Sequence, residues 1–498
     1  MWQVIPLFVA LPLAGAFLLA LAGRGPRRSD AVAVLVSLAL LAASILALRR
    51  VDDSGTAVYA VGGWAPPFGI AMVLDGLSAL LLVTVNLIAA LVVVYALRYL
   101  DAFTGRWQFH CLFLLMLAGM NGVILAGDLF NLFVYLEVAA VSSYALVAFG
   151  TERHELEAAF KYAVMGSLGS LFILLGIVLL YSRTSTLNLA DMAARLQADP
   201  AGLLGWVVLA FFLVGFGLKA AVVPFHAWLP DAHPSAPAPI SAMLSGVLIK
   251  SLGVYALCRV IFGVLGFSPQ VSQVLVTLGL LSMLVGVILA VGQWDFKRLL
   301  AYHSISQVGY IILGVGLGTP LGIAAGLFHL FNHSVFKSLL FLDSGAVEQA
   351  TGTRDLRRMG GLARRMPVTG GTTLVASMSI AGIPPFNGFW SKLLVILAAV
   401  EAGWYWAAFW AVVVSLLTLA SFTKVLKYGF MGATPVRFEG VREAPAAMQV
   451  ALVGLALLCI FGGALWLPEV RSRVLDPAVT VLQGGPAATA ELLARFMP

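Results

Sequence analysis

Long apolar stretches separated by short polar connections recur along all 498 residues of the chain. A helix needs about 20 predominantly apolar residues to cross the hydrocarbon core of a bilayer. Stretches of about that length occur fourteen times, at 3–22, 31–48, 73–97, 109–126, 129–149, 158–182, 203–225, 237–262, 271–291, 299–318, 322–345, 369–400, 405–430 and 447–468. The pattern therefore predicts an all-α polytopic membrane protein with about 14 transmembrane helices.

Composition agrees with this prediction. The chain is 61% hydrophobic and 11% charged, whereas soluble domains carry about 25% charged residues. The three cysteines (Cys111, Cys258 and Cys459) lie in apolar stretches without a CxxC pair, so we expect no disulfide framework, metal site or iron–sulfur cofactor. The net charge of +7 follows from the connecting loops, and no pattern points to nucleic acid.

The basic residues predict an orientation. The stretch 3–22 lacks a positive leading segment and is followed by arginines, the reverse of a signal peptide, so we expect a first transmembrane helix that enters from outside. Odd-numbered connections hold seventeen Lys and Arg, whereas the even-numbered connections and the termini hold seven. The positive-inside rule then makes the odd connections cytoplasmic and places both termini outside. The basic loop 346–368 is interpreted as a topology anchor, with a docking surface as the alternative.

Six basic residues remain inside the spans: Lys161, Lys219, Lys250, Arg259, Lys337 and Lys392. Lys161 and Arg259 lie near span ends, where long side chains can reach the interface. The other four lie deeper. Ionisable residues inside a membrane usually face the bundle interior and mark ion or proton routes, so these four are candidates for function.

The stretch 218–250 organises the candidate chemistry. Lys219 precedes a break at Pro224, and Lys250 lies in the next span. A backbone break at membrane depth is tolerated only inside protein or beside water, which indicates a polar path. Glu137 is the only acid near the middle of an early span. We expect Glu137 and Lys219 to face each other across a contact between the fifth and seventh spans. An ion pair between them that forms and breaks would act as a proton switch; the alternative is a static pair that holds helices together.

A second group lies on the eleventh span. His329, His333 and Lys337 recur at i, i+4 and i+8 and therefore share one helix face. Neutral imidazole can accept and donate protons near physiological pH, so this stripe is a candidate relay. The alternative is that the two histidines are structural. A metal site is not expected here, because no third ligand lies nearby in the sequence. Lys392 follows a second break at Pro384 and Pro385 and is a candidate exit site, or a lysine that reaches the interface.

Further polar residues lie at the span ends. His226, Asp231 and His233 lie at the cytoplasmic mouth of the first break, where we expect them to be solvated and to take part in proton uptake. Three aspartates close to span ends, where acids cost little, are expected to have no role: Asp75, Asp128 and Asp343.

A weak internal repeat relates the two breaks. PFHAWLPD at 224–231 is echoed by PFNGFWSK at 385–392. The second copy lies five spans later, an odd number, so it must be inverted in the membrane. Inverted repeats with broken helices are a transporter architecture.

Longer strings carry a family resemblance: DLFNLFVYLEVAAVSSYALVAFG, LKAAVVPFHAWLPDAHPSAPAPISAMLSGVLIKSLGVY, DFKRLLAYHSISQVGYIILG, LFHLFNHSVFKSLLFL and AGIPPFNGFWSK. These strings resemble the antiporter-like subunits of the complex I superfamily, and most closely the D subunit of Mrp-type Na⁺/H⁺ antiporters. The resemblance implies two inverted five-helix repeats with the seventh and twelfth helices broken. The expected units are N-terminal helices 1–3 (1–100), a first repeat (109–262), a second repeat (271–430), and helix 14 with a tail (447–498).

The resemblance also implies roles for residues. Glu137 takes the helix-5 glutamate role, Lys219 the helix-7 lysine role and Lys250 that of the bridging helix-8 lysine. The remaining matches are the helix-11 relay, which corresponds to His329, His333 and Lys337, and the terminal helix-12 position, which corresponds to Lys392. A lysine at 392 departs from the glutamate of one complex I paralogue. The tail after helix 14 is too short for the long lateral helix of the largest paralogue, so neither assignment is expected.

The implied function is proton translocation within a multi-subunit cation/proton antiporter, with no redox or catalytic centre of its own. The alternative is an ion-pumping subunit of a membrane-bound hydrogenase or a NADH-quinone oxidoreductase. The implied partners are other membrane subunits, protons, Na⁺ or K⁺, and the lipid bilayer. The implied location is the cytoplasmic membrane of a prokaryote.

Overall fold

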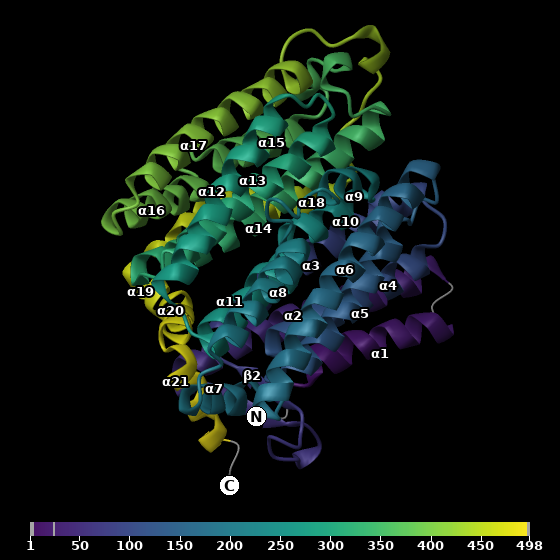
Figure 1. Cartoon of the computed structure of the whole chain (residues 1–498). Coiled ribbons are helices and arrows are strands. Elements are labelled where there is room, and N and C mark those ends of the chain that lie inside the picture. The colour runs from purple at the N-terminus through teal and green to yellow at the C-terminus, as the bar shows by residue number, and fades with distance from the viewer. Residues whose placement is uncertain (1–3, 23–24, 496–498) are drawn as a thin grey trace.

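The computed structural model of this chain is a bundle of helices that run roughly parallel or antiparallel (Figure 1). It describes residues 4–22 and 25–495. Among these residues, eleven helices are long and apolar enough to cross a membrane. The shorter apolar helix α1, the polar-lined helix α14 and the interrupted pair α15–α16 bring the number of crossings to the expected fourteen.

The crossings follow chain order. The uninterrupted ones are α1 (Leu7–Ala22), α2 (Pro26–Ser54), α3 (Gly76–Tyr99), α4 (Arg106–Leu125), α5 (Leu129–Val147), α6 (Arg153–Thr184), α12 (Pro269–Val291), α13 (Phe296–Gly316), α14 (Pro320–Thr351), α17 (Tyr405–Val425) and α18 (Ala446–Phe461). The seventh crossing consists of α8 (Leu203–Ala220) and α9 (Leu229–Ser235), and the twelfth of α15 (Pro367–Ala381) and α16 (Asn387–Glu401). The eighth runs from Ala238 to Leu265 through α10 (Ala238–Met243) and α11 (Ala256–Val260).

Both predicted breaks are present. α8 ends at Ala220, and the left-handed residue Ala221 (φ 55°) turns the chain into a non-helical segment around Pro224. α15 ends in the same manner at Ala381 and is followed by left-handed Gly382 (φ 80°), ahead of Pro384 and Pro385. Proline lacks the N–H that continues a helix, so each break leaves backbone carbonyls without intrahelical partners.

Structural features of the first half recur in the second half with an offset of 167 residues. This structural repeat is more regular than the similarity between the two sequence segments. α6 and α14 are both 32 residues long, and their first residues are Arg153 and Pro320. Each helix ends in a left-handed residue, Ser185 or Gly352. The same offset relates two backbone bridges, Asp128 with Asn188 and Asp295 with Asp355. Because the copies start five crossings apart, they run in opposite directions, as expected of inverted repeats.

Buried amides attach the N-terminal helices to the first repeat. The Asn86 side chain on α3 donates to Ser44 Oγ on α2 at 2.9 Å. Asn86 and Asn121 on α4 exchange hydrogen bonds at 3.2 Å, and Asn121 also donates to the Phe8 carbonyl on α1 at 3.1 Å. Four helices are therefore joined by polar contacts that have no competing water inside a bilayer.

Several elements at one end of the bundle were not predicted. An antiparallel hairpin pairs β1 (Ala57–Ala60) with β2 (Ala71–Leu74). The short helix α7 (Leu189–Ala198) lies at the same end. The chain after α18 forms α19 (Pro468–Val474), α20 (Asp476–Gln483), α21 (Gly485–Glu491) and the 3₁₀ helix η12 (Leu492–Arg495), which run along this end toward α7 (Figure 1). We call this end the α7 face.

Close packing of α12 against α13 gives a stability prediction. A Cβ atom at Gly309 would lie 2.6 Å from the Gly279 carbonyl oxygen and 2.6 Å from the Met283 nitrogen. Gly309→Ala should therefore push the two helices apart and destabilise the protein by about 1–3 kcal/mol. Gly371→Ala on the exposed face of α15 is the control, because a Cβ there meets no atom within 4 Å. Thermal unfolding of the purified protein measures the difference; equal midpoints for the two variants would contradict the packing argument.

Candidate functional site

The first polar cluster joins the fifth and seventh crossings. Lys219 Nζ on α8 lies 3.4 Å from Glu137 Oε1 on α5. Ser170 on α6 donates a hydrogen bond to the same carboxylate oxygen, and Lys219 Nζ also lies 3.4 Å from the Tyr144 hydroxyl. The expected contact between Glu137 and Lys219 is confirmed, and two hydroxyl groups that the sequence analysis did not select complete it.

The pair is less enclosed than expected. The Lys219 side chain is 4% exposed, but that of Glu137 is 30% exposed. The other exposed residues on this face of α5 are apolar: Phe130, Val134 and Val141. Within this chain, the carboxylate therefore lies at the edge of the bundle and not in its centre.

Lys250 lies inside the bundle and is held by backbone carbonyls. Its side chain is fully buried, and Nζ donates to the carbonyl oxygens of Ser245 and Gly246, both at 2.6 Å. These residues belong to a π-helical stretch, Leu244–Leu248, and a second one spans Lys250–Tyr255. π-helical turns often mark functional sites. Here the turns place carbonyl oxygens where a buried ammonium group can use them.

The eighth crossing also contacts the second repeat. Ser245 Oγ lies 2.7 Å from Ser304 Oγ on α13, and Ser338 on α14 lies against Gly246 and donates to the Ala242 carbonyl at 3.3 Å. Lys337, the neighbour of Ser338, is fully buried and donates to the Leu300 carbonyl on α13. The polar groups around Lys250 and Lys337 thus join the two repeats.

The histidine stripe on α14 is present as predicted. The rings of His329 and His333 are nearly parallel, with centroids 6.2 Å apart. Both residues are fully buried, and neither nitrogen of His333 has a hydrogen-bond partner among the described residues. An unpartnered imidazole in the interior is free to bond to water or to a transferred proton.

The stripe continues to Lys392. His329 Nδ1 lies 3.0 Å from Ser391 Oγ, and Lys392 Nζ donates to the Ile380 carbonyl at 2.7 Å, at the edge of the twelfth-crossing break. The Tyr310 ring lies 5.4 Å from the His329 ring and 4.8 Å from Lys392 Nζ. Lys392 is 2% exposed, so the alternative of a lysine that reaches the interface does not apply.

The three residues at the mouth of the first break have different surroundings. His226 and Asp231 are partly exposed, and Asp231 binds Lys161 at 3.2 Å and Arg298 at 3.7 Å. His233, however, is fully buried, and neither ring nitrogen has a partner among the described residues. The expectation that His233 is solvated was wrong, because α9 folds back into the bundle and packs its ring against Trp228 and Phe341.

Other assignments near span ends also need correction. Arg259 does not extend to the interface: its guanidinium forms a two-pronged ion pair with buried Asp75, with both contacts at 2.6 Å. Asp75, at the start of α3, is therefore paired with a residue of another element, the eighth crossing. Asp343 is fully buried and accepts a hydrogen bond from Thr372 at 2.8 Å, so it is not an inexpensive surface acid. Asp128 has a structural role, because its side chain caps α5 by accepting a hydrogen bond from the backbone N–H of Asn131.

His303 on α13 is a buried residue that the sequence analysis passed over. Its Nε2 lies 2.9 Å from Ser421 Oγ on α17. The signal was present in the sequence as a histidine in an apolar span. Its partner lies 118 residues away, so only the fold could show the contact.

The two repeats carry different chemistry on the same scaffold. The 167-residue offset places Ser304 at the position of Glu137, and Lys337 at the position of Ser170. The first repeat thus has a carboxylate–lysine pair, whereas the second has lysines and histidines without an acid at the matching place. No group of three or more His, Cys, Asp or Glu residues in the described part of the chain is arranged to hold a metal ion.

Comparison with known proteins identifies the family. Residues 126–418 match the family described as NADH:quinone oxidoreductase/Mrp antiporter, transmembrane. The chain belongs to this family. The match covers the first break, the eighth crossing and the histidine stripe, and it ends within α17.

Similar proteins include members of two kinds of complex. The chain is 35% identical to a Na⁺/H⁺ antiporter D subunit of Alkalihalophilus pseudofirmus, over 89% of this chain and 91% of that protein. It is 37% identical to the NADH-quinone oxidoreductase N subunit of Desulforudis audaxviator, over 96% and 97%. A protein in the structure of the Mrp complex from Dietzia sp. DQ12-45-1b superposes with a TM-score of 0.91 at 32% identity, over 100% of this chain and 99% of that one.

The Glu137–Lys219 contact gives a testable coupling. Lys219→Met should leave the carboxylate without its cation and lower stability, and Glu137→Gln combined with Lys219→Met should restore part of the loss. Breaking a fully buried pair costs roughly 3–5 kcal/mol; we expect less here because Glu137 is partly exposed. Thermal unfolding of the two single variants and the double variant measures the coupling. Strictly additive effects would show that the two groups do not interact.

Proposed function

We propose that this chain is the proton-translocating membrane subunit of a multi-subunit Na⁺/H⁺ antiporter. The observation that carries the proposal is the series of buried protonatable groups, which runs from the Glu137–Lys219 pair through Lys250 to the α14 stripe and Lys392. Ionisable residues are costly inside a membrane and mark proton routes. Similarity to a Na⁺/H⁺ antiporter D subunit and to an Mrp complex supports the antiporter assignment.

The first repeat supplies a switch in this mechanism. When Lys219 is paired with Glu137, each charge stabilises the other. Separation of the pair would favour transfer of the lysine proton toward Lys250, because an isolated charge is poorly solvated in the bundle. Ser170 and Tyr144 position the carboxylate and the ammonium group. The 3.4 Å separation is compatible with a contact that forms and breaks.

The second repeat supplies a relay toward Lys392. Imidazole can take up a proton on one nitrogen and release one from the other, and the parallel rings of His329 and His333 lie one helical turn apart. Lys337 lies at one end of this stripe, and Ser391, Tyr310 and Lys392 surround the other. Lys392 borders the break in the twelfth crossing and is the proposed exit site.

The remaining assignments concern orientation and uptake. The excess of basic residues in odd connections supports an orientation with the α7 face and both termini outside, and the location that we propose is the cytoplasmic membrane of a prokaryote. In this orientation His226 and Asp231 face the cytoplasmic side and would collect protons, and buried His233 would pass them inward. Na⁺ or K⁺ would be the exchanged cation of the complex.

A second candidate function is that of an ion-pumping subunit in an NADH-quinone oxidoreductase. The specific observation in its favour is the 37% identity to an N subunit of such a complex over nearly the whole chain. The proteins that co-purify with this chain distinguish the candidates: small antiporter subunits support the first, and subunits that carry redox centres support the second.

The partly exposed Glu137 locates a partner surface. A carboxylate on the outside of a bundle at mid-membrane depth would face hydrocarbon, which is unfavourable. We infer that another membrane subunit of the complex covers the α5 face formed by Phe130, Val134, Glu137 and Val141, all exposed or half-exposed in this chain.

Val141→Trp tests this surface. Val141 is 59% exposed, so a tryptophan fits in the isolated chain but would clash with a covering subunit and weaken assembly. Ile288→Trp is the matched control, because Ile288 is 61% exposed on α12, on the other repeat. Native electrophoresis of solubilised membranes measures assembly. If Val141→Trp assembles as well as Ile288→Trp, lipid and not a subunit covers α5.

Glu137→Gln tests the proposed function. The amide keeps the shape and removes the titratable group, so the complex should assemble but lose proton flux in membrane vesicles. Glu137→Asp retains the charge with a shorter reach and should keep partial activity. Glu401→Gln, at an exposed position at the end of α16, controls for the substitution itself. Wild-type flux in Glu137→Gln would show that the carboxylate is only structural.

A further inference from the structure

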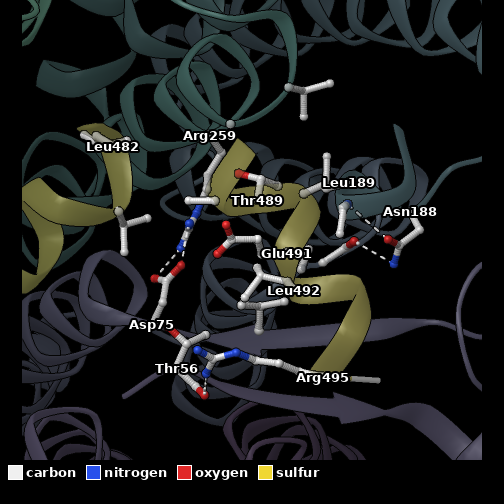
Figure 2. Close-up of a pocket in the computed structure, with 18 of the residues that line it drawn as sticks. Thr56, Asp75, Asn188, Leu189, Arg259, Leu482, Thr489, Glu491, Leu492 and Arg495 are labelled. Carbon is white, nitrogen blue, oxygen red and sulfur yellow. Dashed lines mark hydrogen bonds and ion pairs between the residues drawn. The ribbon is translucent and has the colours of Figure 1, made fainter. Parts of the chain in front are cut away.

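A cavity of about 210 Å³ opens at the α7 face, above the first repeat (Figure 2). Its floor holds the Asp75–Arg259 ion pair, and its wall includes Asn188 from the loop before α7. The roof comes from the far end of the chain, with Thr489 and Glu491 on α21. A cavity of this size that is lined in part by polar groups can hold several water molecules.

The floor of the cavity is continuous with the helix that carries Lys250. Arg259 lies nine residues after Lys250 in the eighth crossing, which is about 13 Å along a helix axis. Arg259 Nε donates to the Tyr255 hydroxyl at 2.8 Å, and Tyr255 donates to the Ile124 carbonyl at the end of α4. Tyr255 therefore carries the polar contacts of the cavity floor to a position five residues after Lys250 in the same crossing.

The Asp75–Arg259 ion pair closes this route at the point where it meets the cavity. Asp75 is 3% exposed, and both of its carboxylate oxygens contact the guanidinium at 2.6 Å. The capping box with Ser78 fixes Asp75 at the start of α3. The arginine, however, is carried by a crossing with π-helical stretches on both sides, Lys250–Tyr255 and Ile261–Leu265. π-helical turns often lie at functional sites, so we place the movable half of the pair on the arginine side.

The C-terminal segment adds an acid at the opening. Figure 2 shows the Glu491 side chain directed into the cavity on the side of Arg259. Glu491 is exposed to solvent, and Arg495 anchors the segment by donating to the Thr56 carbonyl at 2.7 Å. The cavity therefore has a solvent-exposed acid on the same side as Arg259.

We propose that this cavity is the outer aqueous port of the first repeat, through which protons pass between the medium and Lys250. Glu491 exchanges protons with the medium, and the Asp75–Arg259 pair is the closed gate. The port rests on the proposed function and orientation. It adds a route that bypasses the second repeat and assigns a role to the C-terminal helices.

Cysteine modification tests whether the port conducts. In a functional background without Cys111, Cys258 and Cys459, Thr489→Cys places a thiol in the cavity. Ala487→Cys, on the exposed side of the same helix and outside the cavity lining, is the matched control. A membrane-impermeant methanethiosulfonate added to the outside of vesicles that hold the assembled complex should modify both variants. Modified Thr489→Cys should lose the share of its proton flux that passes through the port, whereas modified Ala487→Cys should keep its full flux.

Two results would overturn the port. The first is complete modification of Thr489→Cys without loss of flux, and the second is failure of the reagent to reach Thr489→Cys from outside. The Glu137→Gln variant separates this test from that of the proposed function. If Glu137→Gln is inactive and modified Thr489→Cys keeps its full flux, the proposed function is supported and the port is excluded. If Glu137→Gln is active and modification of Thr489→Cys lowers flux, the proposed switch is excluded and the port is supported.

A double substitution tests the gate. Asp75→Asn with Arg259→Gln removes both charges together and leaves no uncompensated ion. Because the gate is then no longer held closed, passive proton leak across the vesicle membrane should rise above that of the wild-type complex. Asp52→Asn with Arg473→Gln removes an exposed pair at the same face, 3.9 Å apart, and should leave the leak unchanged. Equal leak in both double variants would show that the Asp75–Arg259 pair is only structural.

Discussion

The bundle depends on the need to give each buried ammonium group an acceptor where no bulk water can help. Regular helices use their carbonyl oxygens internally, so acceptors become available mainly where helices are irregular. Lys250 uses carbonyls of a π-helical stretch. Lys392 uses the last turn before the break in the twelfth crossing. Two lysines are exceptions. Lys337 shares a carbonyl of regular α13, whose oxygen has a second lone pair, and Lys219 uses the Glu137 carboxylate on α5. The broken and π-helical segments are therefore what permits a series of buried bases.

The inverted repeat separates scaffold from chemistry. Backbone bridges, helix lengths and left-handed caps recur with an offset of 167 residues, yet the functional positions diverge. Where the first repeat has Glu137 and Ser170, the second has Ser304 and Lys337. The first repeat can thus form a compensated ion pair at the edge of the bundle, whereas the second holds bases that are stabilised only by dipoles and neutral rings. This asymmetry gives the two halves distinct roles in moving a proton, although their folds are equivalent.

Segments outside the repeats complete the molecule at one end. The β-hairpin, α7 and the C-terminal helices cover the α7 face of the first repeat (Figure 1). They bring Asp75, Asn188 and Glu491 around one cavity, although these residues are hundreds of positions apart in the chain. Because these elements are short and not strongly apolar, they left little trace in a pattern dominated by membrane spans.

The sequence by itself determined the crossings, both breaks and most of the buried bases. Apolar runs of bilayer length and prolines within them are local signals, and a lysine among apolar residues is conspicuous without any structure. The i, i+4, i+8 spacing of the histidine stripe likewise follows from helix geometry alone. Only the tertiary structure decided how these groups are surrounded. It buried His233, which lies in a polar, proline-rich stretch that reads as a solvated loop. It also paired Arg259 with Asp75 across 184 positions, and it left Glu137 partly exposed at a bundle edge. Burial and pairing depend on which helix faces meet, and that information is not contained in any single stretch of the chain.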